Sequence, residues 1–171
     1  SMPVVVSVPR GVLPTGSYVK AVVCHLDTPS TLYICPITSV DQFTNILTLS
    51  QDCPPGHVVP AVGNCCLAQD DDCWYRAEIV ELSQDQGLVT VFLLDYGKTV
   101  QATLATLRPL PEVLGTIDGL VCKVSLKGIK AAGNEWSKDE IDGAGIILDA
   151  GNDVTQFQVT VVKVNSKGEV V

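Results

Sequence analysis

Two tyrosines stand near the outer ends of two strand-like runs. Tyr75 belongs to WYRAEIVELS and Tyr96 to LVTVFLLDYG, and a polar turn separates the two runs. Rings in such positions could bind a ligand. The chain carries 19 Asp and Glu against 11 Lys and Arg, a formal net charge of -8, which favours a cationic partner. The same balance disfavours a surface that binds nucleic-acid phosphates, because that affinity rests largely on Lys and Arg.

The cysteines and histidines do not form a catalytic or metal-binding pattern. The cysteines are Cys24, Cys35, Cys53, Cys65, Cys66, Cys73 and Cys122. They are odd in number and include no CxxC pair, so we interpret them as reduced thiols of a cytosolic or nuclear protein, mostly buried as small hydrophobic residues. His25 and His57 have no companions at ligand spacing. We therefore expect no cofactor, no metal and no catalytic histidine.

Membrane insertion and secretion are also disfavoured. No apolar run approaches the roughly 20 residues of a membrane span, and the N-terminal residues lack a basic segment followed by an apolar stretch of signal-peptide length. We expect a soluble protein. Ser1 and Met2 are typical of a remnant left by an expression vector.

The elements that must position the tyrosines are short strands. Residues 57–109 contain HVVPAVGNCCLAQ, WYRAEIVELS, LVTVFLLDYG and KTVQATLATLRPL. The turn Gln84-Asp85-Gln86-Gly87 should close a hairpin. Four or five strands within about 55 residues predict a small antiparallel barrel. Trp74 and Ala77 should pack in or against this barrel.

The flanks predict further strands and helices on both sides of the barrel. A hairpin is expected in 17–38 around the turn at 27–30, followed by a helix that starts near Ser39, presents Phe43 on an apolar face and ends before Pro54. After Pro111 come the strand-like GLVCKVSLKGI, the helix-compatible NEWSKDEIDGAGIILDA and the strand-like VTQFQVTVVKV. We expect a mainly β fold with a few helices. Neither flank can close a core alone, which indicates one discontinuous domain split by the barrel.

The motifs CCLAQDDDCWYRAEI, FLLDYG and LRPLP, in this order, resemble a Tudor domain. With the flanks, including CKVSLKGI and the Trp of NEWS, residues 12–168 resemble the extended Tudor domain, in which an antiparallel Tudor barrel is inserted into a staphylococcal-nuclease-like OB fold. The resemblance divides the chain into an N-terminal OB-like part plus linker helix (1–54), the barrel (55–112) and a C-terminal OB-like part (113–171). Trp136 of NEWS should lie in the core of the flanks.

The resemblance implies methylarginine recognition. In this family an aromatic cage on the barrel receives a dimethylated arginine, usually symmetric, from the tail of a Piwi-type Argonaute protein. A methylated guanidinium keeps its charge and sits well against aromatic faces. Tyr75 and Tyr96 match two cage positions. A third, usually Phe or Tyr, falls on Leu93, and the first falls on Gln69 or Ala68.

The fifth cage position, usually an Asn that binds the guanidinium, falls on Lys98. An ammonium there repels an arginine and offers no acceptor. Lys98 could instead turn outward, or pair with Asp95 or with the acidic turn. That turn is Asp70-Asp71-Asp72, which is either a solvated loop or a device that steers a basic peptide. Asp95 should mainly shape the end of its strand. The resemblance therefore implies a degenerate cage.

The leading hypothesis is a non-enzymatic interaction module that binds an arginine-containing peptide of a Piwi-family protein or another piRNA-pathway scaffold, with weak or no dependence on dimethylation, in perinuclear cytoplasmic germ granules (nuage). One alternative is a structural or self-associating module with a vestigial pocket. A second is RNA binding through the OB-like surface, which the net charge disfavours. A third is a metal-dependent nuclease, but the flanks show no acid cluster and Arg10 is the one arginine outside the barrel region.

Overall fold

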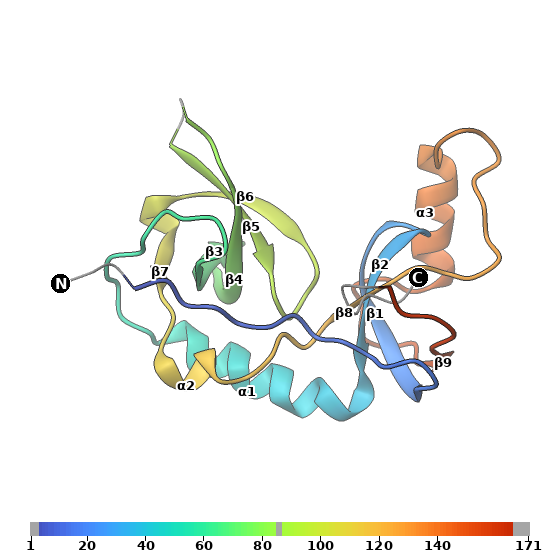
Figure 1. The fold of residues 1–171 in the computed structure, drawn as a ribbon, viewed down its shortest axis with the longest axis horizontal. Helices are drawn as coiled ribbons and strands as arrows, with labels where there is room; N and C mark the ends of the chain where they lie inside the picture. The colour runs from blue at the N-terminus through green and yellow to red at the C-terminus, as the bar shows by residue number, and fades with distance from the viewer. Residues whose placement is uncertain (1–3, 85–86, 166–171) are drawn as a thin grey trace. The chain divides into compact units, whose positions relative to one another are not determined.

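Strands dominate the computed structural model, which describes residues 4–84 and 87–165 (Figure 1). The strands are β1 (Tyr18–Thr28), β2 (Thr31–Pro36), β3 (Cys65–Asp70), β4 (Cys73–Leu82), β5 (Leu88–Leu93), β6 (Thr99–Thr103), β7 (Leu107–Pro109), β8 (Cys122–Val124) and β9 (Phe157–Thr160). The α-helices are α1 (Val40–Gln51), α2 (Glu112–Gly115) and α3 (Lys138–Ile147). Among these described helices, none is long and apolar enough to cross a membrane.

The residues form two compact units by their contacts. One comprises the segment up to Arg10 together with Asp41–Gly119, and the other comprises Gly11–Val40 together with the segment from Leu120 onward. These boundaries differ from the divisions at 54/55 and 112/113 expected from the sequence. The reason is that α1 packs with the barrel: Gln51 Nε2 donates to the Trp74 carbonyl at 2.8 Å, and the Trp74 N–H donates to Gln51 Oε1 at 2.9 Å.

The first unit is built on a five-stranded sheet in the order β6-β5-β4-β3-β7, with all neighbours antiparallel. This confirms the predicted antiparallel barrel. Two details of the prediction are wrong: residues 57–64 precede the first barrel strand and form none themselves, and the 3-10 turn η2 (Leu104–Thr106) interrupts the expected strand at 98–110. The predicted turn at 84–87 includes residues 85 and 86, which lie outside the described residues.

The barrel core uses the inward face of each strand. It consists of Val58, Cys66, Ala68, Ala77, Ile79, Val89, Val91, Leu93, Ala102 and Leu107. Ala77 and Ile79 alternate along β4 as the sequence predicts, because successive side chains of a strand point to opposite faces. Six of the seven cysteines are buried and Cys73 is half-buried, so most of them do pack as small hydrophobic residues.

Residues 4–10 form a strap along the barrel. The Val6 N–H donates to Asn64 Oδ1 at 2.9 Å, the Val6 carbonyl accepts from the Cys65 N–H at 2.8 Å, and Val8 is buried. At its end, Arg10 pairs with Glu78 at 3.2 Å. These contacts explain why the strap belongs to the barrel unit although the next segment of the chain, Gly11–Val40, belongs to the other unit.

The second unit contains a four-stranded sheet in the order β8-β2-β1-β9. β1 and β2 form the predicted hairpin, with Pro29 and Ser30 at its turn. The predicted helix is α3, which starts at a capping box between Ser137 and Glu140. The expectation that Trp136 lies in the core is wrong. Its ring is half-buried because its indole N–H needs a polar partner and donates to Ser30 Oγ at 2.9 Å.

Candidate functional site

The side chains of Tyr75 and Tyr96 meet on the barrel, and we call this pair of rings the corner. Their ring centroids lie 5.7 Å apart with 79° between the planes, an edge-to-face contact that is favourable for aromatic pairs. Both rings are half-buried and pack against the barrel core. Burial, and then the neighbours Cys73, Tyr96 and Asp70, raise the pKa of Tyr75 to about 12. The phenol of Tyr75 is therefore neutral at physiological pH.

The turn after β5 places Tyr96. The Leu93 N–H donates to the Lys98 carbonyl at 2.9 Å, and the Gly97 N–H donates to the Leu93 carbonyl at 2.9 Å. Gly97 has φ of +89°, a left-handed conformation that glycine adopts without a side-chain clash. The closed turn thus fixes where the Tyr96 ring stands relative to β4.

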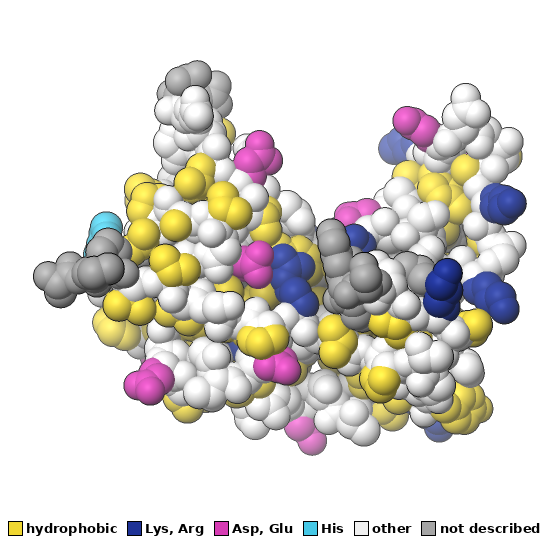
Figure 2. Space-filling model, in the orientation of Figure 1, with side chains coloured by type: hydrophobic (Ala, Val, Ile, Leu, Met, Phe, Trp, Pro, Cys, Tyr) yellow, Lys and Arg dark blue, Asp and Glu magenta, His cyan; other side chains and the backbone are white. Residues whose placement is uncertain are grey.

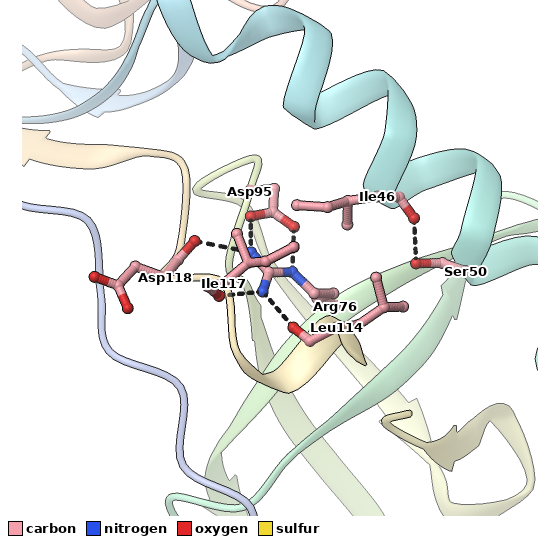
Figure 3. A network of polar contacts seen from close by, with 7 residues as sticks. All are labelled: Ile46, Ser50, Arg76, Asp95, Leu114, Ile117 and Asp118. Atoms are coloured by element: carbon pink, nitrogen blue, oxygen red, sulfur yellow. Dashed lines mark hydrogen bonds and ion pairs between the residues drawn. The ribbon is translucent and has the colours of Figure 1, made fainter. Parts of the chain in front are cut away.

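A buried ion pair stabilises the backbone beside both tyrosines (Figure 3). Arg76, which is 1% exposed, donates from Nε to Asp95 Oδ2 at 2.9 Å and from Nη2 to Asp95 Oδ1 at 2.6 Å. Its remaining donors reach the carbonyls of Leu114, Ile117 and Asp118. All five guanidinium N–H groups are therefore satisfied. Asp95 shapes the end of its strand through this ion pair with Arg76.

Leu93 lies below the corner. It is 2% exposed and pairs across the strands with Ala77. Because Ala77 is two residues from Tyr75 on β4, all three side chains share the inner face of the sheet. Leu93 therefore supplies an apolar floor beneath the two rings.

Ala68 and Gln69, the two residues that the resemblance suggests for the first cage position, lie on opposite faces of β3. Ala68 pairs with Tyr75, whereas Gln69 pairs with Trp74, and paired residues share a face of the sheet. Gln69 consequently lies on the opposite face from Tyr75. Ala68 lies on the correct face but is fully buried in the barrel core. The structure thus brings Tyr75, Leu93 and Tyr96 together and leaves Gln69 apart.

Lys98 forms an ion pair with the acidic turn. Its Nζ lies 3.1 Å from Asp70 Oδ2, and the two side chains are 48% and 27% exposed. Asp70 is two residues from Ala68 on β3 and pairs with Cys73, so it shares the face of Tyr75. The next two residues, Asp71 and Asp72, are exposed and have φ of +51° and +67°. They are the central residues of a tight turn between β3 and β4.

Phe43 of α1 adds a third ring that the motif comparison does not reveal. Its centroid lies 5.5 Å from that of Tyr96, with 61° between the planes. From the sequence, Phe43 is one member of a helical apolar face, and the helix precedes the Tudor-like motifs by many residues. Its helical spacing predicts only that Phe43 lies on the apolar face of the helix.

The barrel unit is strongly acidic. It contains four cationic and eleven acidic residues. Each cation already has a partner in the unit: Arg10, Arg76 and Lys98 form ion pairs, and Arg108 lies 3.9 Å from the ring centroid of Trp74 and donates to the Cys53 carbonyl. The excess negative charge favours the approach of a cationic ligand. Within residues 4–84 and 87–165, no cluster of three or more His, Cys, Asp or Glu is placed to hold a metal ion.

A five-stranded barrel that carries the contacting rings of Tyr75 and Tyr96, in a chain that also forms a four-stranded sheet, defines a Tudor-type module. The family model of the Tudor domain matches residues 13–128, and the chain belongs to the Tudor domain family. Its solved neighbours identify the extended form. One is the third extended Tudor domain of mouse TDRD1 in complex with a MILI peptide containing a dimethylarginine, with a TM-score of 0.82 and 20% identity, covering 96% of this chain and 86% of that one.

Another solved neighbour is an Asp-to-Ala variant of the Drosophila melanogaster Papi extended Tudor domain, in complex with an unmethylated N-terminal peptide of Piwi. It has a TM-score of 0.79 and 18% identity, and the match covers 86% of this chain and 76% of that one. Among curated proteins, the chain is 28% identical over 133 residues to Tudor domain-containing protein 1 of Danio rerio. The match covers 74% of this chain but spans only 11% of the fish protein. The predicted extended Tudor fold is confirmed.

Proposed function

We propose that this domain is a non-enzymatic interaction module that binds an arginine-containing peptide. The observation that carries this proposal is the corner formed by Tyr75 and Tyr96 on an acidic unit. Aromatic faces attract a guanidinium by about 0.5 to 2 kcal/mol per favourable contact, and the surplus of carboxylates adds long-range attraction. Phe43 extends the aromatic surface beside Tyr96.

The cage is degenerate in this proposal, so dimethylation adds little. Leu93 replaces one ring and Ala68 another, which leaves fewer faces for the methyl groups of a modified arginine. Lys98 stands where the family usually has an Asn, so this position offers the guanidinium no amide oxygen as an acceptor. Binding rests on the two tyrosines, Phe43 and the nearby acids, none of which requires a methyl group.

The partner in this proposal is the tail of a Piwi-family protein or another scaffold of the piRNA pathway. Support comes from the solved neighbours, since the mouse domain holds a MILI peptide and the Asp-to-Ala variant of the Papi domain holds a Piwi peptide. A place in cytoplasmic perinuclear germ granules follows from the same likeness. Because the chain spans about a tenth of its curated relative, this proposal concerns the domain rather than a whole protein.

Calorimetry with matched peptides tests the proposal. The peptides share one sequence and carry either arginine or symmetric dimethylarginine at one position. Wild-type protein should bind both with Kd values that differ less than tenfold, and the variant Tyr75→Ala with Tyr96→Ala should lose binding of both. A gain of tenfold or more from methylation, about 1.4 kcal/mol, contradicts the degenerate cage. Equal binding by wild type and the double variant contradicts the assignment of the site.

Self-association is a second candidate function, favoured by the exposed apolar residues of α3. Ile146 and Ile147 are 80% and 77% exposed, and hydrophobic side chains are visible where α3 lies on the face drawn in Figure 2. A second copy could cover them. Light scattering should then show a dimer that Ile146→Glu with Ile147→Glu dissociates. A monomer at every concentration tested eliminates this candidate.

A further inference from the structure

The ion pair between Lys98 and Asp70 lies beside the rings of Tyr75 and Tyr96. Lys98 follows Tyr96 by two residues in the turn after β5, and Asp70 ends β3 on the same sheet face as Tyr75. Their side chains meet at 3.1 Å. The chain thus places its own ammonium on a carboxylate beside the two rings that a ligand cation would use.

Asp70 differs from the other acids near the corner. Asp95 is held by the buried Arg76, and Asp71 and Asp72 are exposed central residues of the β3–β4 turn. Asp70 is half-buried and its partner is a lysine side chain that is 48% exposed. Exposed ion pairs contribute little to stability, because solvent screens them and both side chains lose freedom. The Asp70 carboxylate can therefore exchange its partner.

We propose that Lys98 is a built-in competitor for the ligand, and that a bound arginine takes the Asp70 carboxylate from it. The inference rests on the proposed function. A guanidinium presents two parallel N–H donors that match both oxygens of a carboxylate, whereas an ammonium is a compact point charge. Arginine consequently displaces lysine from Asp70, while a peptide lysine at the same position gains nothing over Lys98.

The same exchange sets the preference for the modification state of the arginine. A methyl group on a guanidinium nitrogen keeps the charge but blocks the paired hydrogen bonds to a carboxylate. Asp70 therefore favours unmodified arginine, and the tyrosines favour the methylated form. The two preferences oppose each other in wild-type protein, which gives a physical reason for weak dependence on methylation.

A double-mutant cycle on Lys98 and Asp70 tests this inference by calorimetry. The proteins are wild type, Lys98→Met, Asp70→Asn and the double variant, each titrated with peptides that carry arginine, symmetric dimethylarginine or lysine at one position. Lys98→Met keeps the chain length and removes the competing charge, so it should tighten arginine-peptide binding about two- to fivefold. Asp70→Asn should weaken it about tenfold, and in that background Lys98→Met should bring a smaller gain, limited to the relief of like-charge repulsion.

The matched control is Lys138→Met, which removes a lysine that is 90% exposed and paired with Asp142 on α3. It changes the net charge by the same amount but lies in the second unit rather than in the barrel unit. If Lys98→Met tightens binding no more than this control, or if its gain is undiminished with Asp70→Asn, Lys98 does not compete for Asp70. That result leaves the proposed function intact wherever binding still needs Tyr75 and Tyr96. If neither wild type nor Lys98→Met binds any peptide, the proposed function and this inference both fail.

Discussion

Arg76 and Asp95 form a bidentate buried ion pair, with Nε–Oδ2 at 2.9 Å and Nη2–Oδ1 at 2.6 Å. Each residue is the chain neighbour of a corner tyrosine, Arg76 after Tyr75 and Asp95 before Tyr96. The pair therefore connects the backbone of β4 to the turn after β5 at the two points that carry the rings. We infer that it positions the corner without facing the ligand.

Removing one member of this pair should destabilise the barrel strongly. Arg76→Met leaves the Asp95 carboxylate and the carbonyls of Leu114, Ile117 and Asp118 without their donors. Loss of one partner of a buried pair typically costs about 3 to 5 kcal/mol. Urea denaturation should show a loss of unfolding free energy in this range.

The matched control for this prediction is Arg10→Met, which removes the partner of Glu78 from an exposed ion pair. Pairs of this kind are worth about 0 to 1 kcal/mol. Arg10 also lies over the Phe92 ring at 3.8 Å, so its loss should be near the upper end of that range. Equal losses for Arg76→Met and Arg10→Met would show that the buried pair has no special role.

Features that depend on neighbouring residues in the chain could be predicted from the sequence. The order of strands around Tyr75 and Tyr96 follows from alternation along β4 and from the turn residues, and Leu93 falls on the inner face because it is an even number of residues from the core positions of β5. The sequence leaves open whether Ala68 or Gln69 occupies the first cage position. Which of the two shares a face with Tyr75 depends on the register of β3 against β4, which the sequence does not specify.

Side-chain partners between distant segments were beyond sequence reasoning. Lys98 had several acidic candidates, and the choice of Asp70 depends on how the end of β3 meets the turn after β5. Phe43 reaches Tyr96 because α1 packs on the barrel within the first unit. Trp136 is expected in the core of the flanks, yet its indole N–H donates to Ser30 Oγ and its ring is half-buried.

The turn between β3 and β4 should tolerate a stabilising replacement. Asp71 and Asp72 both have positive φ, which two-residue hairpin turns require and which Asn-Gly satisfies best. Non-glycine residues in this region cost roughly 1 to 2 kcal/mol, with Asn and Asp at the lower end. Asp71→Asn with Asp72→Gly should raise the unfolding free energy by about 1 kcal/mol, measured by urea denaturation.

The control for the turn is Asp71→Asn with Asp72→Asn, which removes the same two charges without adding a glycine. A gain confined to the glycine-containing variant attributes the effect to backbone conformation. If both variants gain equally, relief of repulsion among neighbouring carboxylates explains the change and the backbone explanation is wrong.

Alkaline pH should reveal the buried state of the Tyr75 phenol. Burial raises its pKa from the ordinary 10.0 to about 12 in the folded protein. A raised folded pKa means that this contribution to stability is fully present below pH 10 and is lost as pH rises through about 12. The unfolding free energy of Tyr75→Phe should therefore fall less steeply between pH 10 and pH 12 than that of wild type.

The thiols of Cys66 and Cys122 also have raised pKa values, about 12 and about 11, because they are buried. Their contribution has the same sign, so only the difference between proteins identifies Tyr75. Tyr18→Phe, which removes a phenol from a residue that is 69% exposed, is the reference variant. Identical pH profiles for the two variants would contradict a special environment for Tyr75.

Phe43 should contribute to ligand binding although it lies outside the Tudor-like motifs. The centroid of its ring lies 5.5 Å from that of Tyr96 in an edge-to-face contact. The Phe43 ring supports Tyr96 and extends the aromatic surface, and its removal loses both contributions. Phe43→Leu keeps an apolar side chain on α1 but removes the ring, and we expect arginine-peptide affinity to fall about three- to tenfold. Phe43→Tyr keeps the ring and should bind like wild type. If Phe43→Leu and Phe43→Tyr bind equally well, the corner consists of Tyr75 and Tyr96 alone, and α1 serves only to complete the barrel unit.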